Sequence, residues 1–240
     1  AGDQDETDRV DSVDAAFHSQ LRKDLTKLLL PNLRSLVCEM NKELPANNLV
    51  TMTSGNVSGR DPETGHVVIK PSGISFQALT PESLSIVDIN GAIIEGELAP
   101  SVDTPTHLYI YRHMAHINGI VHTHSNYATS FAALGEPIPA VLTAIADEFG
   151  GPIPCGPYCR IGEEEIGKSV VEHIGCCPAI LLQNHGVFTV GYDAKAALKP
   201  AVMCEDVAKT VHLALLRGKP ISIPEEEVRR GYRRYQEKYA

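Results

Sequence analysis

The sequence predicts an α/β fold: one domain with a central mixed sheet and helices on both of its faces. Short segments with strand patterns alternate with helical segments along the chain, which is typical of a sheet covered by helices. The 240 residues contain no long linker and no internal repeat, and this length suits a single large domain. The composition, with 43% apolar and 21% charged residues, is that of a globular protein.

Helices are predicted where apolar residues recur three and four positions apart. The first such segment covers residues 13–44, and Pro31 interrupts it so that a second helix covers 33–40, because proline disrupts a helix interior. Asp193 and Gly218 are suited to begin and end one long helix. The other predicted helices cover residues 104–114, 127–134, 163–174 and the segment that follows Pro224.

Strands are predicted where alternating or continuous apolar runs are bounded by turn residues. Asn90-Gly91 is a two-residue hairpin signal between two such runs. Gly55-Asn56 indicates a tight turn after a short strand. The other extended segments are predicted at residues 66–70, 84–89, 92–95, 120–124, 138–147, 153–155, 179–185 and 187–190.

Charge and composition restrict the partners. The net charge of −9 argues against binding to nucleic acid, which requires clustered lysine and arginine. No apolar run reaches the roughly 18 residues needed to cross a bilayer, so no membrane partner is expected. Residues 1–12 are acidic, lack the pattern of a signal peptide and are predicted to be a disordered tail before a domain at 13–240. A cytoplasmic location is therefore expected. The six cysteines are interpreted as free thiols, because their spacing suits neither a disulfide framework nor a structural zinc.

The segment Gly-Ile-Val-His-Thr-His-Ser at 119–125 indicates a metal site. Side chains two apart on a strand point to the same face, so His122 and His124 would present two imidazoles together. His185, in a glycine-flanked turn, and Asp103 are the candidates for the remaining ligands. Three histidine nitrogens with one open position are typical of a catalytic zinc. The alternative interpretation is that these histidines are structural.

A second group of residues is suited to bind an anion. Glycine lets a backbone approach a ligand closely, while asparagine, serine and lysine donate hydrogen bonds to it. Neither a P-loop nor a dinucleotide fingerprint occurs in the sequence, and the same stretches could be ordinary turns. The candidate residues are Asn56 in Thr-Ser-Gly-Asn-Val-Ser, Lys70, Ser72 and Gly73 in Lys-Pro-Ser-Gly, and Ser101.

Taken together, these motifs resemble the class II aldolase/adducin family. The resemblance covers about residues 15–240 and depends on the order and spacing of TSGNVSGRD, IKPSG, SVDTPTH, GIVHTHSNYATSFAALG, IADEFGGPIPC and QNHGVFTVG. It implies a three-layer αβα domain with a largely antiparallel central sheet. It also implies that His122, His124 and His185 bind a divalent metal beside Asp103, which counts among the metal ligands and the catalytic residues. The anion site would hold the phosphate of a sugar phosphate.

The resemblance is strongest to the epimerase branch of the family. The acidic residue beside the histidines is Asp103, as in that branch, whereas the aldolases carry glutamate there. Asp147 matches the acid/base aspartate of the branch. Tyr239 is the best match, and Tyr235 the second, to a terminal tyrosine that acts across a subunit interface. Val102 stands where the family usually has a second serine, and Ile145 where the epimerases commonly have histidine.

The implied activity is the metal-dependent conversion of L-ribulose 5-phosphate to D-xylulose 5-phosphate. C4 has no acidic proton, so inversion requires cleavage of the C3–C4 bond, which leaves a carbanion conjugated with the C2 carbonyl, and re-addition of the aldehyde. The alternatives are a sugar-phosphate aldolase of the L-fuculose-1-phosphate type, a related decarboxylase, and a non-enzymatic adducin-like scaffold. Zn²⁺ is the expected ion with Mn²⁺ as the alternative, and the family implies a homotetramer with active sites between subunits.

Overall fold

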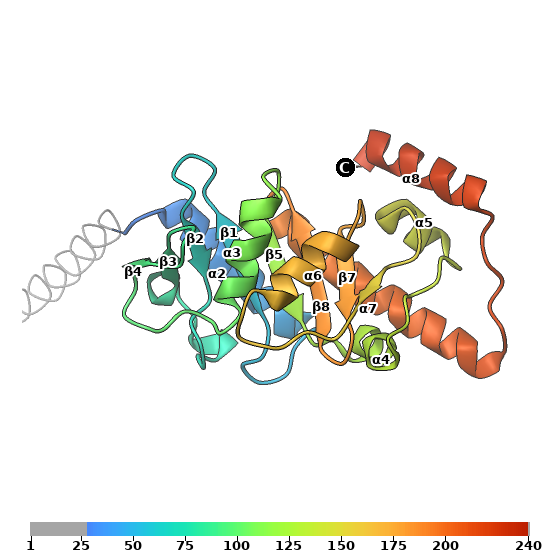
Figure 1. Ribbon diagram of the computed structural model, residues 1–240, viewed down its shortest axis with the longest axis horizontal. Helices are drawn as coiled ribbons and strands as arrows, with labels where there is room; N and C mark the ends of the chain where they lie inside the picture. Colours follow the sequence, from blue (N-terminus) through green and yellow to red (C-terminus); the bar gives the residue numbers. More distant parts are fainter. Residues whose placement is uncertain (1–27, 240) are drawn as a thin grey trace, which may run out of the picture.

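A sheet of eight short strands crosses the middle of the molecule (Figure 1). The computed structural model describes residues 28–239, so the tail predicted for residues 1–12 and the helix predicted from residue 13 to Pro31 lie largely outside the described part. The strands are β1 (Asn56–Arg60), β2 (Val67–Ile69), β3 (Ser85–Val87), β4 (Ile93–Glu95), β5 (Gly119–Thr123), β6 (Cys155–Gly156), β7 (Ala179–Leu182) and β8 (Gly186–Gly191). Their spatial order is β4-β3-β2-β1-β5-β8-β7-β6, and all pairs are antiparallel except β6 with β7. The predicted mixed, largely antiparallel sheet is confirmed.

Helices cover both faces of this sheet, which confirms the predicted three-layer αβα arrangement. The two short 3₁₀ helices η1 (Phe76–Ala78) and η2 (Pro81–Ser83) lie between β2 and β3 in the chain. None of the helices within residues 28–239 is long and apolar enough to span a membrane. The α-helices are α2 (Pro31–Ala46), α3 (Thr104–His113), α4 (Asn126–Leu134), α5 (Thr143–Phe149), α6 (Glu165–His173), α7 (Ala194–Arg217) and α8 (Glu225–Tyr239).

The core lies on the two faces of the sheet because successive residues of each strand point to opposite sides. In β5, Val121 packs with α2 and the first half of α7, whereas Ile120 packs with α3 and α6 on the other face. A third cluster joins α4, α5 and the second half of α7 to β7 and β8. Strands β5 and β8 are therefore buried on both faces, and side chains at their ends are held in a rigid frame. The six cysteines are free, as predicted.

The second predicted helix, at 33–40, forms as the longer α2, and Pro31 occupies its first turn, where the missing proline N–H costs nothing. The helix predicted before Pro31 lies largely outside the described residues. Two other local predictions are wrong for identifiable reasons. The segment 138–147 was predicted to be extended, but from Thr143 it forms α5, which buries Ile145 and Phe149 four residues apart against the third cluster. In addition, Gly55 precedes β1 with a positive φ of 80° rather than following a strand. Short apolar segments do not distinguish strand from helix by pattern alone.

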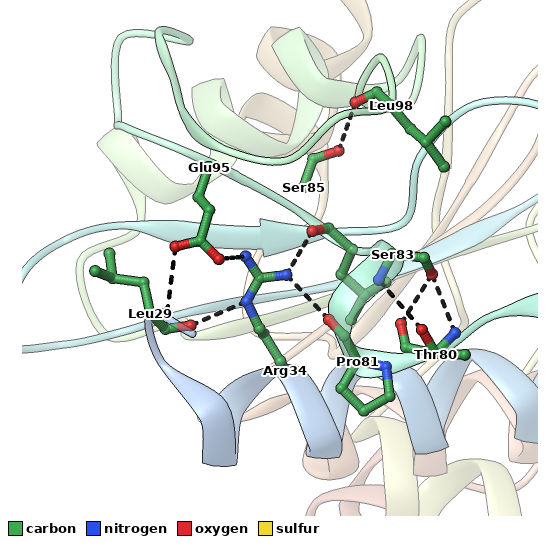
Figure 2. Close-up of polar contacts among 9 residues, drawn as sticks. Leu29, Arg34, Thr80, Pro81, Ser83, Ser85, Glu95 and Leu98 are labelled. Atoms are coloured by element: carbon green, nitrogen blue, oxygen red, sulfur yellow. Dashed lines mark hydrogen bonds and ion pairs between the residues drawn. The ribbon is translucent and has the colours of Figure 1, made fainter. Parts of the chain in front are cut away.

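One buried arginine of α2 forms hydrogen bonds to the outer part of the sheet around β3 and β4 (Figure 2). The guanidinium of Arg34 donates to the carbonyls of Leu29, Pro81 and Leu84 and to the Glu95 carboxylate at 2.5 Å. The Arg34 side chain is fully buried, while that of Glu95 is about one third exposed. Burial lowers the pKa of Arg34, although the neighbouring Glu95 carboxylate acts to raise it. These acceptors offset the cost of burying the cation and tie α2 to β4 and to η2.

We expect Gly119→Ala to destabilise the protein by roughly 3 kcal/mol, at the upper end of the usual cost of overpacking. A Cβ at Gly119 would lie 2.0 Å from the Asp193 carbonyl oxygen, so β5 and the start of α7 would have to separate. The matched control is Gly151→Ala, where a Cβ would meet no atom within 4 Å. Urea unfolding should show a lower midpoint for Gly119→Ala alone, and equal midpoints would contradict the proposed close contact.

Candidate functional site

Three histidines meet at one end of the central strands. His122 is in β5, His124 follows that strand, and His185 lies in the turn between β7 and β8. The ring centroids are 4.6 Å apart for His122 and His124, 4.8 Å for His122 and His185, and 5.3 Å for His124 and His185. One nitrogen from each ring lies within 4.8 Å of the others. The structure therefore brings together the three histidines predicted from the sequence.

The nitrogens of these rings are suited to a metal ion. The Nδ1 of His122 is 2.9 Å from the Val187 carbonyl oxygen, to which it donates, so its Nε2 carries the lone pair. Within residues 28–239, the buried Nε2 of His124 and Nδ1 of His185 have no hydrogen-bond partner. Burial lowers the pKa of His122 to about 3 and also lowers the pKa values of His124 and His185. Neutral imidazoles with unpaired nitrogens fit a divalent cation.

The histidines open into a cavity of about 310 Å³, and the predicted anion-binding residues line it too. Two loops that line the cavity pair with each other: Ser72 donates its N–H to the Ala99 carbonyl, and Ser101 donates its N–H to the Lys70 carbonyl. This pairing places residues from distant parts of the sequence side by side. All five predicted anion-binding residues line the cavity: Asn56, Lys70, Ser72, Gly73 and Ser101.

Lys70 is a buried cation among the residues that line this cavity. Its side chain is 2% exposed, and its Nζ donates to the Thr53 carbonyl at 3.2 Å and lies 4.9 Å from the centre of the Phe76 ring. Among the described residues it forms no salt bridge. Burial lowers its pKa, and the more distant Asp103 opposes that shift. Because a buried charge is costly without a partner, this ammonium is suited to pair with an anion that enters the cavity.

Asp103 lies beside the histidines at the start of α3. Its Oδ2 accepts a hydrogen bond from the Asn56 amide at 2.7 Å, and the same amide donates to the Ser101 hydroxyl at 3.1 Å. Burial acts to raise the carboxyl pKa of Asp103, but the neighbouring histidines and the hydrogen bond from Asn56 together keep it below its usual value. Asp103 lines the cavity but is not part of the tight cluster formed by the three histidines. The Asn56 amide nitrogen thus orients Asp103, a role that the sequence did not indicate.

The other predicted catalytic residues lie elsewhere within the chain. Asp147 lines a separate cavity of about 290 Å³ between α5 and α8, where Arg234 donates to both of its oxygens at 2.9 and 3.1 Å. Tyr235 lines a third cavity and packs under the ammonium of Lys199, which is 4.7 Å from its ring centre. Tyr239 is the last residue of α8, and its side chain is outside the described part of the structure. In Figure 1, α5 and α8 lie together at the opposite end of the molecule from β4.

Two exposed apolar residues at the rim complete the cavity. Val102 is 62% exposed and Ile161 is 65% exposed, and both line the opening. The sequence marks Val102 only as a departure from the family pattern. Ile161 was not predicted, because it lies in the irregular loop before α6 and no periodicity or motif marks it.

The family assignment follows from a match over most of the chain. The family model described as Class II Aldolase and Adducin N-terminal domain matches residues 35–212, a range that contains the three histidines and every residue of their cavity. The chain belongs to the class II aldolase and adducin family. This membership confirms the resemblance inferred from the sequence motifs.

Solved structures of class II aldolases share this fold. An L-fuculose 1-phosphate aldolase is 31% identical over 85% of this chain and 96% of its own, with a TM-score of 0.81. An L-fuculose-1-phosphate aldolase from Thermus thermophilus is 27% identical over 78% of this chain and 97% of its own, with a TM-score of 0.65. A sugar-phosphate aldolase from Thermotoga maritima is 20% identical over 81% of this chain and 98% of its own, with a TM-score of 0.67, and shows likeness of fold alone.

Proposed function

We propose that this protein is a metal-dependent enzyme that cleaves a carbon–carbon bond of a sugar phosphate by a retro-aldol reaction. One observation carries the proposal: a single cavity of about 310 Å³ is lined both by three neutral histidines and by Lys70, whose buried ammonium forms no salt bridge with any described residue. A metal site and an anion site in one cavity fit a substrate with a carbonyl at one end and a phosphate at the other. The similarity to L-fuculose 1-phosphate aldolases supports the same chemistry.

The residues at the anion end would hold the phosphate. Lys70 supplies the charge, and the exposed turn at Ser72 and Gly73 supplies donors at the rim, where Gly73 has the positive φ of 72° that glycine tolerates. Ser101 lies between this turn and Asp103 and would contact the phosphate with its hydroxyl. Asn56 would act mainly by fixing Asp103, because its amide nitrogen is engaged there.

The residues at the metal end would carry the bond cleavage. We propose that His122, His124 and His185 hold Zn²⁺, with Mn²⁺ as the alternative, and that Asp103 contacts the ion or the substrate beside it. A bound divalent cation would supply Lewis-acid stabilisation of the negative charge that forms next to the carbonyl when the bond breaks. Asp103, held by Asn56, would accept the proton of the substrate hydroxyl on the carbon that leaves as an aldehyde. The rim residues would restrict the access of water to that carbon.

Epimerisation of L-ribulose 5-phosphate at C4 is the second candidate function, and Asp103 favours it. The epimerase branch resembled by the sequence carries aspartate at this position, where the aldolases carry glutamate. The same bond cleavage would then be followed by rotation of the aldehyde and re-addition on its other face. This requires proton donors on both sides of C4, the roles predicted for Asp147 and Tyr239.

The position of Asp147 indicates which parts of two neighbouring subunits would meet in the proposed oligomer. Asp147 and α8 lie away from the chain's own histidine cavity, so they would act only on the cavity of a neighbouring subunit. We propose a homotetramer in which α5 and the end of α8 from one subunit approach the metal site of the next. Arg234, which pairs with Asp147, would lie at the same interface.

The two functions differ in their products, which gives a direct test. The Zn²⁺-loaded protein should convert L-fuculose 1-phosphate to dihydroxyacetone phosphate and an aldehyde, which a coupled NADH assay detects. Incubation with L-ribulose 5-phosphate, followed by NMR, would show D-xylulose 5-phosphate if the protein is instead the epimerase. EDTA should abolish either reaction. If the metal-loaded protein acts on neither substrate and cleaves no other sugar phosphate, the proposed function is wrong.

A further inference from the structure

His124 differs from His122 in how its ring is held. The His122 ring is fixed by the hydrogen bond from its Nδ1 to the Val187 carbonyl, and it stacks on Phe188 with centroids 4.2 Å apart. Among residues 28–239, no hydrogen bond fixes the His124 ring, and its Nε2 is buried without a partner. The direction of the His124 ring therefore depends on the backbone on either side of it and on packing.

One side of His124 is packed too tightly to adjust. A Cβ at Gly186 would lie 2.7 Å from Cδ2 of His124 and 2.4 Å from the Thr123 carbonyl oxygen. The backbone of β8 thus approaches the ring as closely as glycine allows. A displacement of the backbone after His124 would consequently change where its nitrogen points.

The backbone after His124 begins helix α4. The N-cap residue of this helix does not accept a hydrogen bond from any of its first amide N–H groups. Ser125 is in the N-cap position, where a serine hydroxyl usually accepts from the second or third amide of the helix. Here Ser125 makes no such bond, and its buried hydroxyl has no partner within the described residues. Some other group must satisfy these amides for the first turn to be stable.

Glu205 of α7 provides that group. Its two carboxylate oxygens accept hydrogen bonds from the N–H of Tyr127 at 3.0 Å and of Ala128 at 2.9 Å, the second and third residues of α4. A negative charge is also favourable at the positive end of the helix dipole. Helix α7 packs against β5 and β8, the strands that border the histidines, so Glu205 fixes α4 relative to the same frame.

We propose that Glu205 is a positioning residue for the metal site: by holding the first turn of α4, it directs the His124 ring towards His122 and His185. Nothing in the sequence marks this role, because Glu205 is distant from His124 along the chain and belongs to no motif. The inference rests on the proposed metal site. It predicts that the charge and reach of Glu205 affect metal affinity, beyond any effect on folding.

The test measures Co²⁺ binding to the metal-free, full-length protein. Affinity is obtained by competition with a chelator, and the visible spectrum of bound Co²⁺ reports the ligand geometry. Glu205→Gln, which keeps the size but loses the charge and one acceptor, and Glu205→Ala should weaken Co²⁺ binding by about tenfold to a hundredfold and alter the spectrum. Glu205→Asp should recover part of the affinity. The matched control is Asp206→Asn, the next and exposed acidic residue of α7, which should bind Co²⁺ as the wild type does.

The melting temperature of each metal-free variant separates positioning from simple capping. If Glu205→Gln melts at a lower temperature yet binds Co²⁺ with wild-type affinity and spectrum, Glu205 only caps α4 and the inference is wrong. If Glu205→Ala fails to fold, Glu205→Gln alone still distinguishes these two roles. Failure of the wild-type protein itself to bind Co²⁺ or Zn²⁺ would instead refute the proposed metal site, so the two failures are distinguishable.

Discussion

Replacement of His185 by alanine is expected to remove the bound metal and to lower kcat by about three orders of magnitude, equivalent to roughly 4 kcal/mol of transition-state stabilisation. His185 lies in the turn between β7 and β8, and it is the one member of the triad that does not come from the segment at 119–125. Without it, two imidazoles remain, and two nitrogen ligands hold a divalent cation much more weakly than three. The fold should be retained, because a turn residue that is only partly buried contributes little to the core.

Metal content by mass spectrometry and steady-state turnover of the accepted sugar phosphate would check this prediction. The matched control is His116→Ala, since His116 is an exposed histidine in the loop before β5 and should leave both quantities unchanged. Full metal content together with wild-type turnover in His185→Ala would show that the three histidines are a structural cluster.

Lys70→Met is expected to raise KM for the phosphorylated substrate by about two to three orders of magnitude, because loss of a buried charge partner typically costs about 3–4 kcal/mol. Methionine has nearly the length of lysine but no charge, so the wall of the cavity would be kept. The free energy of unfolding should stay the same or increase, because the variant no longer buries an unpaired ammonium in the free protein. Affinity and stability are therefore predicted to change in opposite directions.

Comparison of a phosphorylated substrate with its unphosphorylated sugar isolates the charge effect. The rate of the unphosphorylated sugar, measured at high concentration, should be the same in Lys70→Met and wild type. Lys42→Met on the exposed face of α2 is the control for the loss of a positive charge in general. Equal loss of activity towards both substrates would indicate that Lys70 maintains the cavity rather than binding phosphate.

Much of the fold was predictable because its signals are local. The hairpin at Asn90-Gly91 forms between β3 and β4, and the Asp88 side chain accepts from the amides of Asn90 and Ala92 within the turn. Asp193 caps α7 by accepting from the Ala196 amide, as its position predicted. Turn and cap residues act within a few positions of themselves, so no distant contact is needed to recognise them.

Where the local sequence pattern is ambiguous, packing against neighbouring elements decided the secondary structure. The residues from Thr143 to Phe149 were predicted to be extended as far as Asp147, yet they form α5, because a helix places Ile145 and Phe149 on one face in the core cluster with α4 and α7. The sequence of this segment permits two structures, and the burial available from neighbouring elements selects one of them.

The sequence by itself determined the chemistry available at the site. It placed two imidazoles two residues apart at the end of an apolar strand, a third in a glycine-flanked turn, and a lysine and serines in turns suited to an anion. The tertiary structure decided which of these meet. The antiparallel pairing of β1 with β5 sets Asn56 opposite His122, and the cavity joins the histidines to Lys70 but leaves Asp147 with Arg234. Side-chain alternation is a property of neighbours in the chain, whereas strand register and helix packing depend on the whole core.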